Sequence, residues 1–148
     1  MLNRIIGRVE RDPLYRRIMD ADHREPEATA ADAITAAARQ VAHTISAAAI
    51  VTFTSTGSTT FRAARERPGV PILGLTPNPA TARRMALAWG VHPMLTEDLH
   101  SFAEMVSNSV GVACTEGFAS SGERLVVTAG VPFGTPGATN ILRIAWVE

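Results

Sequence analysis

Short apolar runs recur along the chain at intervals typical of a protein built around a sheet. Each run is rich in β-branched residues, has the length of a strand and is bounded by turn residues. The predicted strands are Ala48–Thr54, Val70–Thr76, Val91–Leu95, Arg124–Val131 and Asn140–Val147.

Segments with apolar residues at helical spacing precede and separate these strands. The predicted helices are Leu2–Val9, Thr29–Ser46, Thr59–Arg67, Pro79–Trp89 and Asp98–Glu116. Thr29 and Asn78 stand at N-cap positions, and Asp98 opens the last of these helices. The stretch Met19–Ala30 is charged and weakly hydrophobic, which predicts an exposed connector.

Strands that alternate with helices predict βαβ units and a mainly parallel sheet with helices on both faces. The last two strands are joined by "PFGTPGAT", which is too short for a helical crossover. The fifth strand should therefore run antiparallel to the fourth and lie at an edge. We expect a three-layer α/β/α domain over residues 28–148, preceded by a helical arm and connector over residues 1–27.

The composition narrows the class of protein. The chain has 148 residues, of which 46% are hydrophobic, and this suits one compact domain. The formal net charge is zero, so nothing suggests a general attraction to nucleic acid or to an anionic membrane. All 14 basic residues are arginine, which excludes a Walker or Schiff-base lysine. A single cysteine, Cys114, and the lack of a long apolar window favour a cytoplasmic protein.

Two loops have the composition of a phosphate site. In open α/β sheets, ligands bind beyond the carboxyl ends of the strands, where the strand order reverses. If the first and fourth strands are neighbours there, backbone N–H groups at a helix N-terminus and several hydroxyls would converge on an anion. The first loop consists of Thr54, Ser55, Thr56, Gly57, Ser58 and Thr59. The second loop, Gly130–Gly137, contributes Gly130, Gly134, Thr135 and Gly137.

Ordinary turn and cap chemistry is the alternative interpretation of the same loops, because Ser, Thr and Gly are common there. The first loop has neither the Walker lysine nor the dinucleotide glycine spacing. At Gly57, a side chain would crowd a bound anion or be incompatible with a left-handed backbone.

No catalytic or metal-binding constellation stands out. The four histidines lack metal-ligand spacing, and no nucleophile has a positioned base. We expect His92 to be structural, His43 to serve packing or an interface, and Cys114 to behave as a small buried hydrophobe. We therefore expect a binding domain without a metal or cofactor of its own, rather than a complete enzyme.

Several stretches in order along the chain resemble one family, the C-terminal domain of pyruvate kinase. The resemblance runs from the alanine-rich helix at Thr29 through the third predicted strand, and includes Ala64–Pro68 and Thr76–Pro79. It continues in the closing motif, with Ala129–Pro132 and Gly137–Asn140. The opening "MLNRI", with a glutamate and an aromatic residue after it, is similar to the end of the last helical segment of that enzyme's barrel domain.

The resemblance implies a mixed five-stranded sheet in the order 3-2-1-4-5, a phosphorylated effector and a subunit interface of a homotetramer. In that family the catalytic residues, with Mg²⁺ and K⁺, belong to a (β/α)8 barrel. Such a barrel needs about 250 residues. We therefore expect this chain to be a fragment, a separately expressed regulatory domain or a free-standing relative, with the barrel as its missing partner.

The resemblance also assigns roles to the two loops. It implies that Thr54–Thr59 binds the phosphate of a sugar-phosphate activator and that Gly130–Gly137 is the facing effector loop. Family members that bind fructose bisphosphate often carry a basic residue in the first loop, where this sequence has Ser55 and Ser58. A hexose phosphate, ribose phosphate or AMP is then at least as suitable as a bisphosphate.

Three functions remain open at this point. The first is a regulatory and oligomerisation domain that is inactive alone. The second is a free-standing protein or enzyme that binds a phosphate ester in the same pocket. The third is a purely structural domain with a vestigial effector loop. Binding of sugar phosphates separates the first from the third, and the second needs a catalytic group near the loops.

Overall fold

A computed structural model describes residues 1–21, 25–99, 101–132, 135 and 138–148. The described chain forms one five-stranded sheet in the order β3-β2-β1-β4-β5. Its strands are β1 Ala49–Phe53, β2 Ile72–Thr76, β3 Val91–Leu95, β4 Arg124–Gly130 and β5 Thr139–Trp146. The first four are mutually parallel and β5 is antiparallel to β4. The predicted order, the mixed sheet and the antiparallel edge strand are confirmed.

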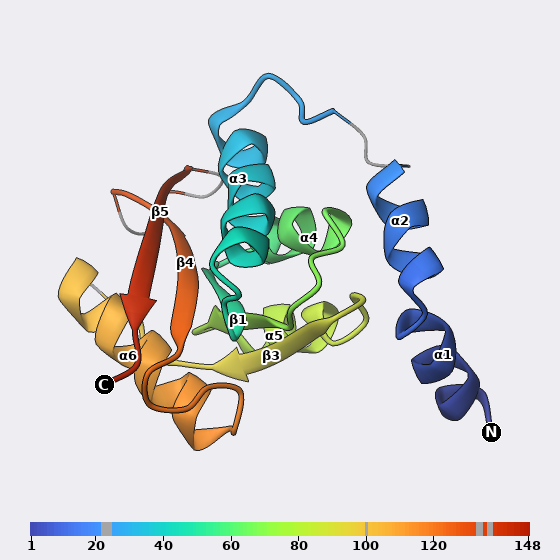
Figure 1. The fold of residues 1–148 in the computed structure, drawn as a ribbon. Helices are drawn as coiled ribbons and strands as arrows, with labels where there is room; N and C mark the ends of the chain where they lie inside the picture. The colour runs from blue at the N-terminus through green and yellow to red at the C-terminus, as the bar shows by residue number, and fades with distance from the viewer. Residues whose placement is uncertain (22–24, 100, 133–134, 136–137) are drawn as a thin grey trace.

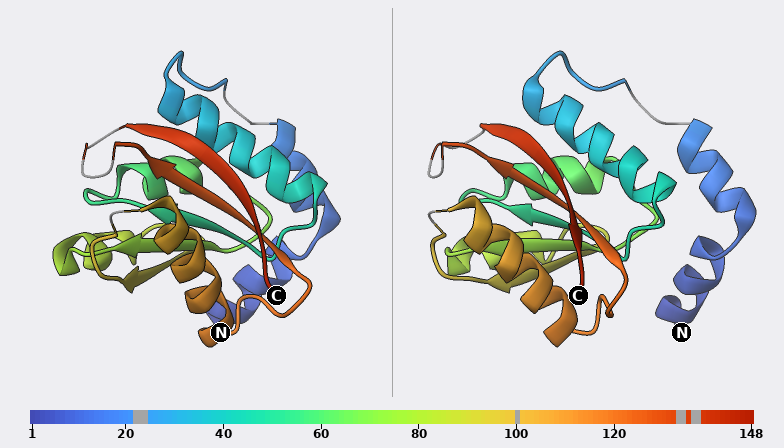
Figure 2. Two further views of the ribbon diagram at one scale, coloured as in Figure 1. Left: turned by 90° about the vertical axis from the view of Figure 1, so that its left-hand side faces the viewer. Right: turned by 60° about the vertical axis from the view of Figure 1, so that its left-hand side comes forward.

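Helices cover both faces of this sheet, so the predicted three layers are present (Figures 1 and 2). Helices α3 Ala30–Thr44, α4 Ser58–Arg65 and α5 Pro79–Met85 pack on one face. Helix α6 Phe102–Thr115 packs on the other. This arrangement brings the loops after β1 and β4 to the same edge of the sheet, because those two strands are parallel neighbours.

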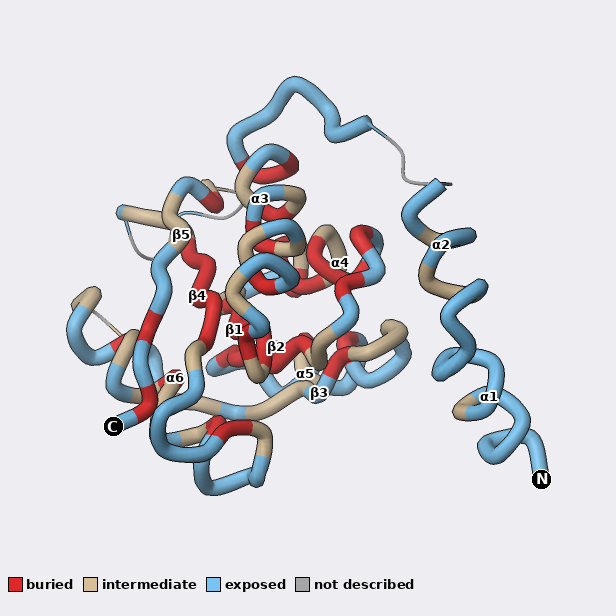
Figure 3. The backbone as a smooth tube through the Cα atoms, in the orientation of Figure 1, coloured by how far each residue is buried: buried red, intermediate tan, exposed pale blue. Residues whose placement is uncertain are grey.

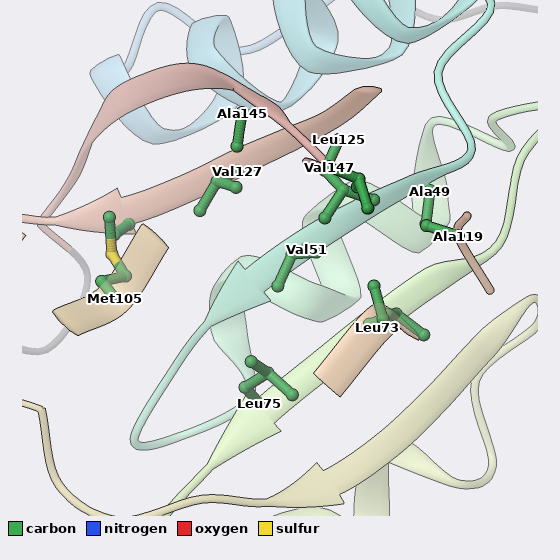
Figure 4. Close-up of a cluster of buried hydrophobic side chains, with 12 residues drawn as sticks. Ala49, Val51, Leu73, Leu75, Met105, Ala119, Leu125, Val127, Ala145 and Val147 are labelled. Atoms are coloured by element: carbon green, nitrogen blue, oxygen red, sulfur yellow. The ribbon is translucent and has the colours of Figure 1, made fainter. Parts of the chain in front are cut away.

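Alternate residues of each strand build the two cores. On the α6 side, Val51, Leu73 and Val127 are fully buried and belong to one core with Met105 of α6 (Figure 4). On the opposite side, Ile50, Ile72 and Val126 pack against small residues of α3 and α4. Both sets of side chains come from the same strands, since successive residues of a strand point to opposite faces. Burial on both faces explains why these strands read as continuous apolar runs.

Gly74 in β2 permits close packing on the second side. A Cβ there would lie 3.1 Å from Cγ2 of Thr60 in α4 and 3.2 Å from Sδ of Met85 in α5. The two helices therefore approach the backbone of β2 more closely than a larger residue would allow.

Two predicted helix boundaries were wrong by more than two residues. Helix α6 begins after Ser101, whose hydroxyl accepts a hydrogen bond from the Glu104 N–H, and not at Asp98. Helix α5 ends at Met85, four residues before Trp89, because the next turn tightens. In that turn the N–H of Leu87 donates to the carbonyl of Arg84, three residues back.

The N-terminal arm holds one more helix than the sequence predicted. Helix α1 Leu2–Glu10 is followed directly by α2 Pro13–Ala21. Proline fits the first helical position, and the Asp12 carboxylate accepts the N–H of Leu14 at 2.8 Å. Neither helix has a buried residue (Figure 3). Among the described residues, no helix has both the length and the apolar character that a membrane crossing requires.

Candidate functional site

A hollow lies at the carboxyl ends of the parallel strands, where the sequence predicted a site. Its lining is drawn from the ends of all five strands and includes Thr54, Thr96, Gly130 and Thr139. The centre of a water-sized sphere can move through about 70 Å³ of this hollow. A cavity that holds a single water has roughly 10–15 Å³ of such space. The hollow therefore has room for a group the size of a phosphate.

The loop after β1 forms one wall of this hollow. The Thr54 hydroxyl accepts the Gly57 N–H at 2.9 Å, which folds the loop into a tight turn. Ser55 and Thr56 are exposed at its tip, and the Thr56 hydroxyl donates to Oγ of Ser58 at 3.2 Å. The hydroxyls of this loop thus serve partly as turn chemistry, as the alternative interpretation proposed.

Gly57 is buried beneath this loop and does not line the hollow. Its φ of +89° lies in the left-handed region, so the predicted left-handed backbone at this glycine is present. A Cβ at Gly57 would lie 2.9 Å from Cε2 of Phe61. The crowding partner is therefore the aromatic ring of Phe61 rather than a bound anion, and substitution there disturbs the fold as well.

Helix α4 presents its N-terminus to the hollow. Gly57 is its N-cap and supplies no side-chain hydrogen bond to the first turn. Ser58 and Thr59, the first residues of α4, line the hollow. First-turn N–H groups have no intrahelical acceptor, and they carry the positive end of the helix dipole. This wall can therefore bind an anion through backbone groups.

One contact ties the second loop to the first, and a pair of hydrogen bonds closes the second loop at its base. The hydroxyls of Thr59 and Thr139 are 2.6 Å apart, and both residues are buried. The Asn140 side-chain amide closes the base of the loop: it accepts the Val131 N–H at 2.9 Å and donates to the Val131 carbonyl at 2.7 Å. The predicted juxtaposition of the loops after β1 and β4 is therefore present.

Helix α5 supports the first loop from outside. The Thr81 hydroxyl donates to the Ser55 carbonyl at 2.9 Å, and Arg84 donates to the Thr56 carbonyl at 3.1 Å. Arg84 also lies 5.9 Å from the centre of the Phe61 ring. A basic side chain is thus next to this loop although the loop itself has none, and the sequence analysis missed it because it comes from another helix.

The segment after β3 forms an acidic wall. Glu97 and Asp98 line the hollow together with Thr96 and Leu99. Asp98 was predicted as a helix start, and its true place is in this wall. The available signal was its place three residues after Leu95, the last residue of β3, since the parallel strands of the sheet all end at this edge.

The predicted site residues divide into three groups. Those that line the hollow are Thr54, Ser55, Thr56, Ser58, Thr59, Gly130 and Thr135. Gly57 supports the loop from below, and Gly134 and Gly137 lie outside the described residues. Thr139 was not among the predicted site residues, although it belongs to the closing motif and its hydroxyl is hydrogen-bonded to that of Thr59.

The far end of α4 is held by a buried carboxylate. Asp32 in the first turn of α3 is fully buried and accepts from Nε of Arg62 at 2.9 Å and Nη2 of Arg65 at 2.5 Å. It also accepts the Glu27 N–H at 3.1 Å. Burial raises the pKa of Asp32, but the hydrogen bond from Arg65, the Glu27 N–H and the two positive charges together lower it below its ordinary value.

Other candidate side chains are remote from the hollow. Cys114 is exposed in the last turn of α6, so the expectation of a buried thiol was wrong. The His92 ring packs 4.7 Å from the ring of Phe118, which agrees with a structural role. His43 is exposed on α3. Within the described residues, no group of three His, Cys, Asp or Glu side chains is placed to hold a metal ion.

The fold is an α/β domain with a hollow at the carboxyl edge of its sheet. The chain belongs to the pyruvate kinase alpha/beta domain family, whose model matches residues 32–145. The resemblance found in the sequence is confirmed.

Individual relatives and a solved structure agree with this assignment. A pyruvate kinase of Methylorubrum extorquens is 49% identical over 99% of this chain, and one of Agrobacterium vitis is 38% identical over 97%. The chain spans 30% of the length of each of these relatives. A crystal structure of a Cryptosporidium parvum pyruvate kinase superposes with a TM-score of 0.74 at 27% identity, over 82% of this chain and 23% of that one.

Proposed function

We propose that this chain is the regulatory and oligomerisation domain of a glycolytic pyruvate kinase, and that it binds a phosphorylated effector in the hollow. The hollow between the two loops carries the proposal. It joins the uncapped N-terminus of α4, the hydroxyls of Ser55 and Ser58, and the braced start of β5 at Thr139. Each element favours a phosphate ester over an apolar ligand.

The expected affinity is moderate. A hydrogen bond to a charged group contributes about 1.5–3 kcal/mol before the cost of ordering the ligand. Several such bonds support a dissociation constant in the micromolar to millimolar range. The second loop adds contacts with the sugar, so inorganic phosphate should bind more weakly than a sugar phosphate.

In the parent enzyme we assign phosphate transfer from phosphoenolpyruvate to ADP to the barrel, together with Mg²⁺ and K⁺. The chain of 148 residues alone is then expected to give no pyruvate above a blank in a coupled assay with both ions. Turnover that survives further purification would contradict the assignment.

Calorimetry of the chain against ribose 5-phosphate, glucose 6-phosphate, AMP and inorganic phosphate tests the proposal. We expect at least one ester to bind, and Ser58→Ala to weaken that binding. This substitution removes a hydroxyl that lines the hollow and keeps the backbone N–H groups at the start of α4. Absence of binding by every ester would leave only the structural interpretation of the loops.

A further inference from the structure

The N-terminal arm, residues 2–21, lies beside the domain rather than within either of its helical layers (Figure 1). A groove separates the arm from the domain. Pro71 and Gly90 line this groove and directly precede β2 and β3, so it lies at the opposite edge of the sheet from the hollow. The arm contributes Glu10, Tyr15, Arg16 and Met19 to the lining, and the domain contributes Arg67–Pro71, Trp89, Gly90 and His92.

Polar side chains connect the arm to the domain across this groove. The indole N–H of Trp89 donates to Oε1 of Glu10 at 2.8 Å, and this hydrogen bond is exposed to solvent. Further along the arm, the Asp20 carboxylate accepts a hydrogen bond from Arg39 of α3. The Asp20 side chain is 48% exposed. Exposed pairs of this kind contribute little to stability, so the attachment of the arm is weak.

The apolar side of the arm adds little to this attachment. Neither α1 nor α2 has a buried residue. Burial of apolar surface is the main force that holds a helix to a protein core, and it is small here. The large apolar side chains of the arm that are more than half exposed are Leu2, Ile5, Ile6, Val9, Leu14 and Ile18.

The helices of the arm are too short to be stable alone. Helices α1 and α2 have nine residues each, and isolated helices shorter than about 12–15 residues are marginal in water. An arm that leaves the domain should therefore lose its helical order. Attachment and order are coupled, which is the behaviour of a local order–disorder transition.

We propose that the arm is a releasable strap over the amino-terminal edge of the sheet. It is helical while Glu10 holds Trp89 and Asp20 holds Arg39, and it unfolds when these contacts open. Release uncovers Trp89 and the groove. The sheet and its covering helices stay folded, because neither core contains a residue of the arm. High ionic strength favours release, because salt screens the pair of Asp20 and Arg39.

Amide hydrogen exchange followed by mass spectrometry tests this inference. In the unaltered chain, the amides of the arm should exchange at least about tenfold faster than those of β1 and β4, but more slowly than in a synthetic peptide of residues 1–21. In Glu10→Ala/Asp20→Ala, exchange in the arm should rise by about threefold or more toward the rate of the peptide. Exchange in the sheet should not change. A molar concentration of NaCl should act on the unaltered chain in the same direction.

The fluorescence of Trp89 gives a second measurement. The chain has two tryptophans, so Trp146→Phe leaves Trp89 alone. In this background, quenching by acrylamide should increase when Glu10→Ala/Asp20→Ala is added. Glu116→Ala/Glu148→Ala is the matched control, because it removes the same formal charge from two exposed residues outside the arm. It should change neither the quenching nor the exchange of the arm.

Three results would overturn the inference. If the arm exchanges together with the sheet, it belongs to the same cooperative unit and is not a strap. If the arm of the unaltered chain exchanges at the rate of the peptide, it is not attached in solution. If Glu10→Ala/Asp20→Ala leaves exchange in the arm unchanged, the two carboxylates do not hold it.

Discussion

Asp32 joins two helices through charged hydrogen bonds, and it is fully buried while Arg62 and Arg65 are partly exposed. Asp32→Asn should lower the free energy of unfolding by about 1–3 kcal/mol, the range for charged hydrogen bonds discounted for the exposed arginines. Urea denaturation at pH 7 measures this as a lower midpoint with an unchanged slope. Glu116→Gln on the surface should shift stability by less than about 0.5 kcal/mol.

The pH dependence of this effect follows from the lowered pKa of Asp32. A carboxyl whose folded pKa lies below its unfolded value of about 3.9 stabilises the fold fully above that pH. The contribution is lost as the pH falls through the folded pKa. The difference in stability between the unaltered chain and Asp32→Asn should therefore be constant from neutral pH to about pH 5 and shrink below about pH 4. A difference that persists unchanged at lower pH would show that packing, not charge, sets it.

Gly57 combines a left-handed backbone with a close aromatic neighbour. Gly57→Ala should cost about 1–2 kcal/mol for the backbone alone, and more because its Cβ would lie 2.9 Å from the Phe61 ring. Gly117 has a similar φ of +75° with nothing within 4 Å of its Cβ position. Gly117→Ala therefore measures the backbone cost alone, and thermal unfolding of both variants isolates the contact with Phe61. Equal losses in the two variants would rule out any contribution from that ring.

At the scale of elements, the Thr59–Thr139 pair links the start of α4 to the start of β5. Thr59→Val leaves the buried Thr139 hydroxyl without this partner, and should cost about 1–3 kcal/mol. The double variant Thr59→Val/Thr139→Val removes both polar groups, so its loss should be smaller than the sum of the single losses. A double-mutant cycle measured by urea denaturation tests this coupling, and additive losses would contradict it.

The strands and most helices could be predicted because each leaves a pattern of apolar residues within a short segment of the sequence. Helices show apolar residues at helical spacing, and strands buried on both faces are continuous apolar runs. Helix ends were less predictable where two caps compete. Asp98 and Ser101 are both good N-caps, and Ser101 prevails with Glu104 three residues later, as in a capping box. Helix α2 was missed because Pro13 was interpreted as a break, although proline also suits the first residue of a new helix.

At the scale of the whole molecule, the sequence could place the loops after β1 and β4 together, since βαβ topology brings parallel strand ends to one edge. It could not place Glu97 and Asp98 in the lining of the hollow, or Arg84 beside the loop after β1. Those contacts depend on which helix lies next to which strand end, and local spacing carries no such information. The polarity of the hollow therefore emerges only in the folded chain.

Two surfaces of the folded chain suit contact with a second copy. The face of α3 that points away from the sheet exposes Ala30, Ala33 and Ala37. On the opposite face of this helix, Ala38 and Ala42 are buried in the core against the sheet. Small residues let two helices approach closely. Strand β5 is the last strand of the sheet, so one of its edges has no neighbouring strand in the described chain. Such an edge is a template for pairing, and its side chains include Ile144, which is 37% exposed.

We therefore expect the chain to self-associate, with a mass above that of a monomer in light scattering at high concentration. Ala37→Arg should shift the mass toward the monomer if the α3 face is the interface, because a guanidinium would hold two helices apart and lose hydration. Ile144→Glu makes the same test of the β5 edge. Ala103→Arg, at an exposed position of α6, is the matched control and should leave the mass unchanged. A monomer for the unaltered chain at every concentration would rule out both surfaces, and an effect of Ile144→Glu alone would assign the interface to the strand.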